Sequence, residues 1–304
     1  MKMMLSNNKY KSLVVDIIIF IIGTVLAKSI QFFLMPLYTT YMSPEAYGIA
    51  ELTNTLAEFF YPLVTLCIYE GAFRFAVDPD YDNSTVATAT AKVLIVSLGG
   101  GFILACILKV CFHYENSFLL FFVLYTYSFR MCMAFYVRGT GKSVAFAISG
   151  LVNALALGVY NYIFLVYLNM GVSGYLYSIG MGYLTSAVYL LIFGSVIKDI
   201  NMGANVKREL NDLLHYCCPL IIYNVLYWFT AISGRYILAY YMDASAAGKY
   251  VAAIKIAAVV NMIQQAVYAA IQLNTSRQYT EDNKKQYYTE VTNFFCVFIA
   301  FLER

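Results

Sequence analysis

The chain has 304 residues, of which 61% are hydrophobic and only 12% are charged, and its mean hydropathy is +0.67. A soluble domain carries about a quarter charged residues, so this composition excludes an ordinary water-soluble globular protein and requires lipid as the solvent for much of the surface. The formal net charge of +3 argues against nucleic acid as a partner.

Nine apolar runs follow one another along the chain and predict an all-α, polytopic membrane helix bundle. The first run follows the basic segment "MKMMLSNNKYKS", and it is longer than the core of a signal peptide, so we interpret it as a membrane span. Short connectors with Gly, Pro, Asn or Asp join the runs, as expected between bundle helices. The predicted spans cover 13–38, 47–69, 87–111, 117–137, 144–168, 172–196, 214–240, 247–272 and 291–302. The ninth run is too short to cross a bilayer, which predicts a fragment or a truncated reading frame.

One short segment occurs twice. "YMSPEAYG" (Tyr41–Gly48) follows the first span, and "YMDASAAG" (Tyr241–Gly248) follows the seventh, 200 positions later (241 minus 41). Six spans separate the two copies, so both lie on the same side of the membrane. This pattern predicts two six-helix lobes related by a parallel repeat, with an axis along the membrane normal. The predicted division is 1–200 for the first lobe and 201–304 for helices seven, eight and part of nine of the second.

The distribution of Lys and Arg predicts the orientation, because cytoplasmic loops carry an excess of both. Lys109, Lys249 and Arg235 lie near span ends on one side. Many more basic residues lie on the other side: Lys2, Lys9, Lys11, Arg74, Lys92, Arg138, Lys142, Lys198, Lys207, Arg208, Arg277, Lys284 and Lys285. We therefore expect a cytoplasmic N-terminus, and both copies of the repeated segment outside. Arg138 and Lys142 are interpreted as topology determinants.

Polar residues inside the spans are costly, by roughly 2.5–3.5 kcal/mol for a charge at the bilayer centre, and therefore point to function. The second span carries Glu51, Asn54, Thr55 and Glu58 at spacings that place them on one helical face. At a rise of about 1.5 Å per residue, Lys28 of the first span falls between the two glutamates in depth. The cluster is either a buried ion pair that specifies the bundle or a polar wall of a water-filled cavity.

Basic residues at membrane depth come from both halves of the chain. A shift of 200 residues maps Thr55 onto Lys255, and Arg130 and Arg235 lie within the fourth and seventh spans. Together with Lys28, these side chains suit an anionic headgroup such as a diphosphate. For both arginines the alternative is a side chain that snorkels to the nearer membrane interface.

No enzyme motif is found. "RGTGKS" (138–143) lacks the first glycine of a nucleotide-binding loop, and it follows a membrane helix rather than a strand. The two histidines have no Ser or Asp partner at motif spacing, and the seven cysteines lack metal-type spacing. We therefore expect neither catalytic residues nor a metal or cofactor.

Two segments carry a family resemblance. "GTVLAKSIQFFLMPLYTTYMSPEAYGIAELTNTLAEFFYPLVTLCIYEGAFRFAVD" (23–78) resembles the opening of bacterial polysaccharide transporters, in Gly23, Lys28, Pro36, Tyr47-Gly48 and Arg74-Phe75. "RYILAYYMDASAAGKYVAAIKIAAVV" (235–260) resembles helices seven and eight of their second lobe. These proteins are the oligosaccharide flippases of the multidrug/oligosaccharidyl-lipid/polysaccharide exporter superfamily. One departure is Gly234, where relatives often have an acidic residue.

The resemblance implies a non-enzymatic flippase of the bacterial cytoplasmic membrane. Its cargo would be an undecaprenyl-diphosphate-linked oligosaccharide, such as a repeat unit of O-antigen, capsule or exopolysaccharide, passed by alternating access through a cationic cavity. Lys28, Arg130, Arg235 and Lys255 would bind the headgroup, and Glu51 or Glu58 would couple a proton or sodium ion. Membrane lipid and polysaccharide polymerase machinery are the other expected partners. The alternatives are a multidrug cation antiporter of the same superfamily, a membrane enzyme of the same pathway, or an inactive fragment.

Overall fold

The computed structural model describes residues 23, 26–27, 29–30, 33–243 and 245–254, and these are helical without a strand. The all-α prediction is therefore confirmed for the described part of the chain. The helices are α2 (Met35–Tyr41), α3 (Pro44–Val64), α4 (Ile68–Val77), α5 (Asn83–Cys111), α6 (Ser117–Gly139), α7 (Ser143–Asn161), the π-helix η1 (Tyr162–Tyr167), α8 (Gly171–Phe193), α9 (Val196–Asp199) and α10 (Lys207–Tyr241). A further helix covers 245–254.

Four helices of the described residues are long and apolar enough to cross a membrane: α5, α6, α7 with η1, and α8. They confirm the spans predicted at 87–111, 117–137, 144–168 and 172–196. The seventh predicted span, 214–240, lies within α10, which is one continuous helix. Most of the first and eighth predicted spans and all of the ninth lie outside the described residues.

The second predicted span, 47–69, is wrong in one respect, because it is two helices rather than one. α3 and α4 are bent by 58° at the break between them. The amide of Cys67 donates to the Pro62 carbonyl at 2.8 Å, and that of Leu66 to the Leu63 carbonyl at 3.3 Å. This pair of bonds is the Schellman arrangement that ends a helix. Leu66 and Cys67 both have positive φ, 54° and 55°, so the turn is made without the usual glycine.

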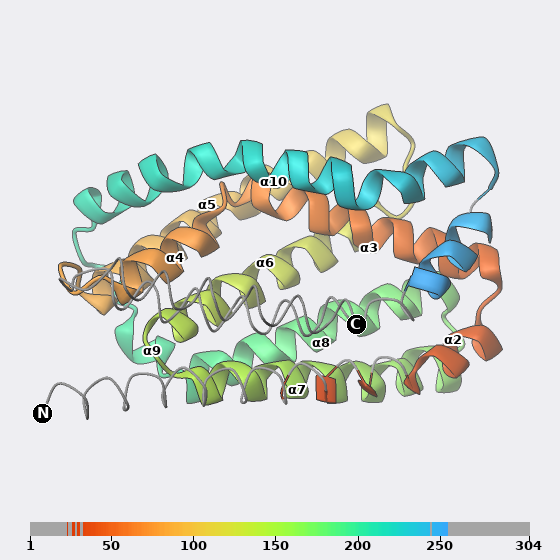
Figure 1. The fold of residues 1–304 in the computed structure, drawn as a ribbon, viewed down its shortest axis with the longest axis horizontal. Coiled ribbons are helices and arrows are strands. Elements are labelled where there is room, and N and C mark those ends of the chain that lie inside the picture. The colour runs from red at the N-terminus through yellow and green to blue at the C-terminus, as the bar shows by residue number, and fades with distance from the viewer. Residues whose placement is uncertain (1–22, 24–25, 28, 31–32, 244, 255–304) are drawn as a thin grey trace, which may run out of the picture.

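The helices form successive layers, seen in Figure 1. α10 lies along α3 and α4, α6 packs against α3 and α4 from the other side, and α8 and α7 follow in turn. Two buried apolar clusters hold the layers together. One joins α4, α5 and α6 to Leu213 and Cys217 of α10. The other joins α3, α6 and α8. α10, the first helix of the predicted second lobe, therefore packs directly on the first lobe.

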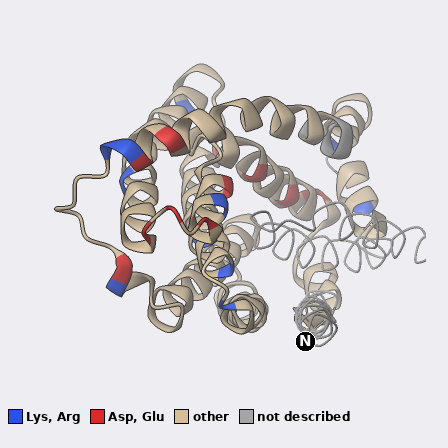
Figure 2. Cartoon of the chain, turned by 60° about the vertical axis from the view of Figure 1, so that its left-hand side comes forward, with Lys and Arg blue, Asp and Glu red and all other residues tan. Residues whose placement is uncertain are grey.

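Most of the basic residues that the structure describes lie at one end of the bundle, which Figure 2 turns toward the viewer. This end carries the C-terminus of α4 and the N-termini of α5, α7 and α10. The predicted orientation depends on this asymmetry of charge and stays a prediction. Arg138 differs from a simple loop charge: it is 4% exposed, and its guanidinium lies 4.3 Å from the ring centre of Phe73 and 4.5 Å from that of Phe135.

Candidate functional site

Glu51 lies at the centre of a group of tyrosines between α2, α3 and α8. It is 5% exposed, and one carboxylate oxygen accepts hydrogen bonds from the hydroxyls of Tyr47, at 3.0 Å, and Tyr175. Tyr47 is one turn earlier on α3, whereas Tyr175 comes from α8. Tyr38 of α2 completes the group, with ring centroids 5.8 Å from Tyr47 and 5.0 Å from Tyr175. A carboxylate buried this deeply is suited to hold a proton or a small cation.

Asn161 connects this group to a distortion of α7. Its side-chain amide donates to the Tyr38 hydroxyl at 3.0 Å and to the Leu157 carbonyl at 2.8 Å. Its amide oxygen is buried without a hydrogen-bond partner. The π-helix η1 begins at the next residue, and such π-turns within helices occur frequently at functional sites.

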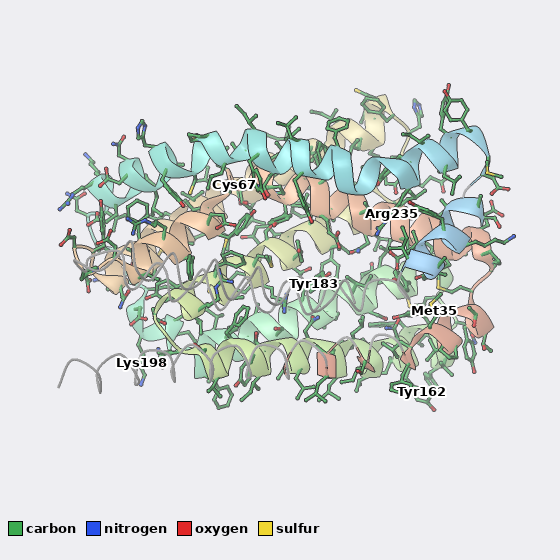
Figure 3. The ribbon with its side chains drawn as sticks, in the orientation of Figure 1. Met35, Cys67, Tyr162, Tyr183, Lys198 and Arg235 are labelled. Atoms are coloured by element: carbon green, nitrogen blue, oxygen red, sulfur yellow. The ribbon has the colours of Figure 1, made fainter. Side chains whose placement is uncertain are left out.

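Glu58 belongs to a second polar group, two turns farther along α3. It accepts a hydrogen bond of 3.1 Å from Asn54. Tyr127 of α6 and Tyr183 of α8 pack against each other, with centroids 4.9 Å apart, and both lie within electrostatic range of Glu58 and Arg130. This group therefore brings a carboxylate, a guanidinium and two phenols together between α3, α6 and α8, in the region where Figure 3 labels Tyr183.

Arg130 is held inside the lobe. Its Nε donates to the Ser186 hydroxyl at 3.1 Å, and Ser186 donates to the Ser149 carbonyl. The guanidinium also lies over the Tyr183 ring, 5.9 Å from the centroid. These contacts come from α7 and α8, so the side chain faces the interior of the bundle near the middle of α6 rather than reaching to an end.

Arg235, which is labelled in Figure 3, connects α10 to α3. Its Nη1 donates to the Thr55 hydroxyl at 3.1 Å, and the neighbouring Tyr236 hydroxyl donates to the Leu52 carbonyl at 2.7 Å. The Nε of Arg235 is buried without a hydrogen-bond partner. The only ion pairs found among the described residues are Arg74–Asp78 and Arg208–Asp212, so neither Arg130 nor Arg235 is paired there with a carboxylate.

The predicted site is thus brought together in part. Lys28 and Lys255 lie outside the described residues, and their roles stay predictions. Glu51 and Glu58, predicted as one acidic face, belong to two different groups. Helix spacing reveals Tyr47, which precedes Glu51 by four residues, but no sequence signal identifies Tyr175. Within the described part of the chain, no group of three or more His, Cys, Asp or Glu is placed to hold a metal ion.

The chain is similar to known proteins in structure, but the sequence comparisons find no match. No family model matches the chain, and no curated protein is similar to it. A MATE protein solved in complex with Br-NRF superposes with a TM-score of 0.66 and 16% identity, over 97% of this chain and 74% of that one. A point mutant of the Vibrio cholerae MATE transporter VcmN gives 0.64 and 11%, over 90% and 66%.

A third structure, a MATE protein in a bent conformation, superposes with a TM-score of 0.62 and 15% identity, over 97% of this chain and 70% of that one. The chain thus spans about two thirds to three quarters of the length of these neighbours. Such low identity carries the architecture and not the substrate. The chain has the membrane helix-bundle fold of the MATE (multidrug and toxic compound extrusion) transporters.

Proposed function

We propose that the chain belongs to a membrane exporter, not an enzyme, that moves an undecaprenyl-diphosphate-linked oligosaccharide across the bacterial cytoplasmic membrane. The observation that carries this proposal is the pair Arg130 and Arg235, two guanidinium groups at membrane depth without a carboxylate partner among the described residues. An unpaired charge in this environment is costly. A diphosphate supplies the missing negative charge and matches the fork of guanidinium donors.

The proposed cycle is alternating access between two lobes. The diphosphate binds Arg130 and Arg235, with Lys28 and Lys255 as further predicted contacts, while the polyprenyl tail stays in lipid. Glu51 and Glu58 supply the coupling. Uptake of a proton or sodium ion at the buried Glu51 neutralises its charge and changes its bonds to Tyr47 and Tyr175, which shifts α3 relative to α8.

A second candidate is a multidrug cation antiporter. It is favoured by the MATE fold and by the burial of Glu51, because a buried carboxylate inside a cage of aromatic rings suits an organic cation as well as a coupling ion. For this candidate Arg130 and Arg235 are unfavourable, because their positive charges would repel a cationic substrate.

One experiment separates the two candidates. The full reading frame is expressed in a strain that lacks its oligosaccharide flippase and makes a matched glycan, and surface glycan is measured. We expect rescue by the parent, loss of at least tenfold in Arg130→Gln and Arg235→Gln, and near-parental rescue by Arg208→Gln. Arg208 is the matched control, because it is an exposed arginine paired with Asp212.

The opposite result is equally informative. Efflux of a cationic dye that survives Arg130→Gln but is lost in Glu51→Gln, together with no glycan rescue, would establish the antiporter instead. Coupling is tested in the same cells: unchanged dependence on the proton and sodium gradients in Glu51→Gln and Glu58→Gln would exclude both glutamates as coupling groups.

A further inference from the structure

The two similar hairpins of the sequence touch each other in the structure. Gly248 lies in the helix 245–254, and Gly48 lies in the first turns of α3. A Cβ atom placed on Gly248 would lie 2.7 Å from the Pro44 carbonyl oxygen, 3.2 Å from the Gly48 amide nitrogen and 3.3 Å from the Gly48 Cα. All three are backbone atoms, so no side-chain rotation would relieve the overlap. The helices meet backbone to backbone, a closeness that only a missing side chain permits.

The two hairpins also share one local feature, a side-chain cap at the start of the second helix. In the first, the Ser43 hydroxyl accepts a hydrogen bond from the Ala46 amide at 3.1 Å. In the second, the Asp243 carboxylate accepts one from the Ala246 amide. Both are N-caps that start a helix three residues before the alanine that the two copies share. The 200-residue repeat is therefore a repeat of structure at these positions, with different side chains performing the same task.

The partners in the close contact are equivalent residues, since 248 minus 48 is 200. In an arrangement with two-fold symmetry, a residue contacts its own copy only where it lies on the axis. In the predicted parallel repeat, the Gly48–Gly248 contact would therefore lie on the axis that relates the two copies. Farther along α3, Thr55 and Leu52 receive hydrogen bonds from Arg235 and Tyr236 of α10, so α3 is held to the later helices at more than one point.

We propose that Gly48 and Gly248 form a gate on the symmetry axis at the end opposite the basic one. The gate is closed in this structure, and its two glycines separate when the binding region opens to that side. The proposal rests on the alternating-access function above and adds the point at which the lobes meet. A side chain at Gly248 would hold the lobes apart and favour the state open to the outside.

The test measures access rather than transport. Val251 is 2% exposed and lies three residues after Gly248, on the same helical face. In Val251→Cys, a membrane-impermeant thiol reagent is added from outside to cells that express the full reading frame. The labelling rate above that of the parent, which has its native cysteines, is measured. Adding Gly248→Ala is expected to raise this rate at least fivefold.

The matched control is Gly234→Ala. It makes the same change near the C-terminal end of α10, but among the described residues its Cβ would contact only the Tyr250 hydroxyl, at an ordinary 3.6 Å. Tyr236→Phe is the second variant, because it adds no atom and removes one hydrogen bond between α10 and α3. It is expected to raise labelling about twofold, and it carries the test if Gly248→Ala does not accumulate in the membrane.

Equal labelling in the presence and absence of Gly248→Ala and Tyr236→Phe, or an equal rise in Gly234→Ala, would overturn the gate. The transport proposal is judged separately by glycan rescue. If labelling rises as expected but neither glycan rescue nor dye efflux is seen, the gate is supported and the proposed function is contradicted. If glycan is rescued but labelling does not change, the proposed function is supported and the gate is contradicted.

Discussion

Glu51 and Glu58 are two turns apart on the same helix, and their surroundings differ. Glu51 is almost fully buried and is held by two tyrosine hydroxyls, one of them from α8. Glu58 is half-buried, accepts a bond from its own helix, and faces the phenols and guanidinium of α6 and α8. Identical side chains on one helical face thus belong to different chemical environments. The two glutamates are therefore expected to differ in how much each contributes to stability, whatever coupling they share.

The largest difference is expected for truncation of the two carboxylates. Glu51→Ala leaves two buried tyrosine hydroxyls without their acceptor, and we expect it to lower the free energy of unfolding by about 3 kcal/mol. Glu58→Ala removes a half-buried group with a local partner, and about 1 kcal/mol is expected. Denaturant titration in detergent measures both. Equal losses would show that the two sites are not energetically distinct.

The next largest effect concerns the tyrosine that reaches Glu51 from another helix. Tyr175→Phe removes one hydrogen bond to a charged acceptor, and about 2 kcal/mol of unfolding free energy is expected to be lost. Tyr183→Phe is the paired change on the Glu58 side. It keeps the ring beneath the Arg130 guanidinium, so a loss below about 0.5 kcal/mol is expected. A larger loss of unfolding free energy in Tyr183→Phe than in Tyr175→Phe would contradict the expected difference between the two sites.

A smaller effect is expected for the tyrosine on the same helix as Glu51. Tyr47→Phe removes the 3.0 Å bond between residues four apart on α3, and we expect a loss of about 1 kcal/mol. Because Tyr47 and Tyr175 donate to the same carboxylate oxygen, either one still satisfies it when the other is removed, so the double variant should lose more than the sum of the two single losses. Strict additivity in the double-mutant cycle would contradict a shared acceptor.

The smallest change in stability is expected for Arg130→Lys. The charge stays, and an ammonium can replace the single bond from Nε to Ser186, so the unfolding free energy should change by about 0.5 kcal/mol or less. Glycan rescue should nevertheless fall several-fold, because an ammonium lacks the guanidinium fork for a diphosphate. Full rescue of surface glycan by Arg130→Lys would contradict bidentate binding of the diphosphate by Arg130.

The long spans were predictable because each is one apolar run with polar ends, as in α5 and α8. The break between α3 and α4 was not, since "PLVTLCIYE" stays apolar across it and no glycine marks the left-handed turn at Leu66 and Cys67. A Schellman turn without glycine leaves almost no compositional signal. Pro62 is the one local cue, because it removes the amide that would bond the carbonyl of Glu58.

The acidic face of α3 was predictable from helix spacing, but the different partners of the residues on that face were not. Spacing places Glu51 and Thr55 together, whereas the fold turns Glu51 toward Tyr175 and Thr55 toward Arg235. Those partners lie 124 and 180 residues away, and no local pattern encodes which distant helix will pack there. The shift of 200 residues makes Gly48 and Gly248 equivalent positions, but it does not predict that they touch.

The break between α3 and α4 also bears on how the protein is assembled. Irregular backbone at membrane depth is tolerated only where protein covers it. Here the cover comes from α10, whose Asn224 accepts a hydrogen bond from the Tyr69 hydroxyl and donates one to the Cys67 sulfur. A nascent chain therefore holds an unsealed break until α10 is inserted. A product ending at residue 200 should therefore be cleared by membrane proteases faster than one ending after Tyr241.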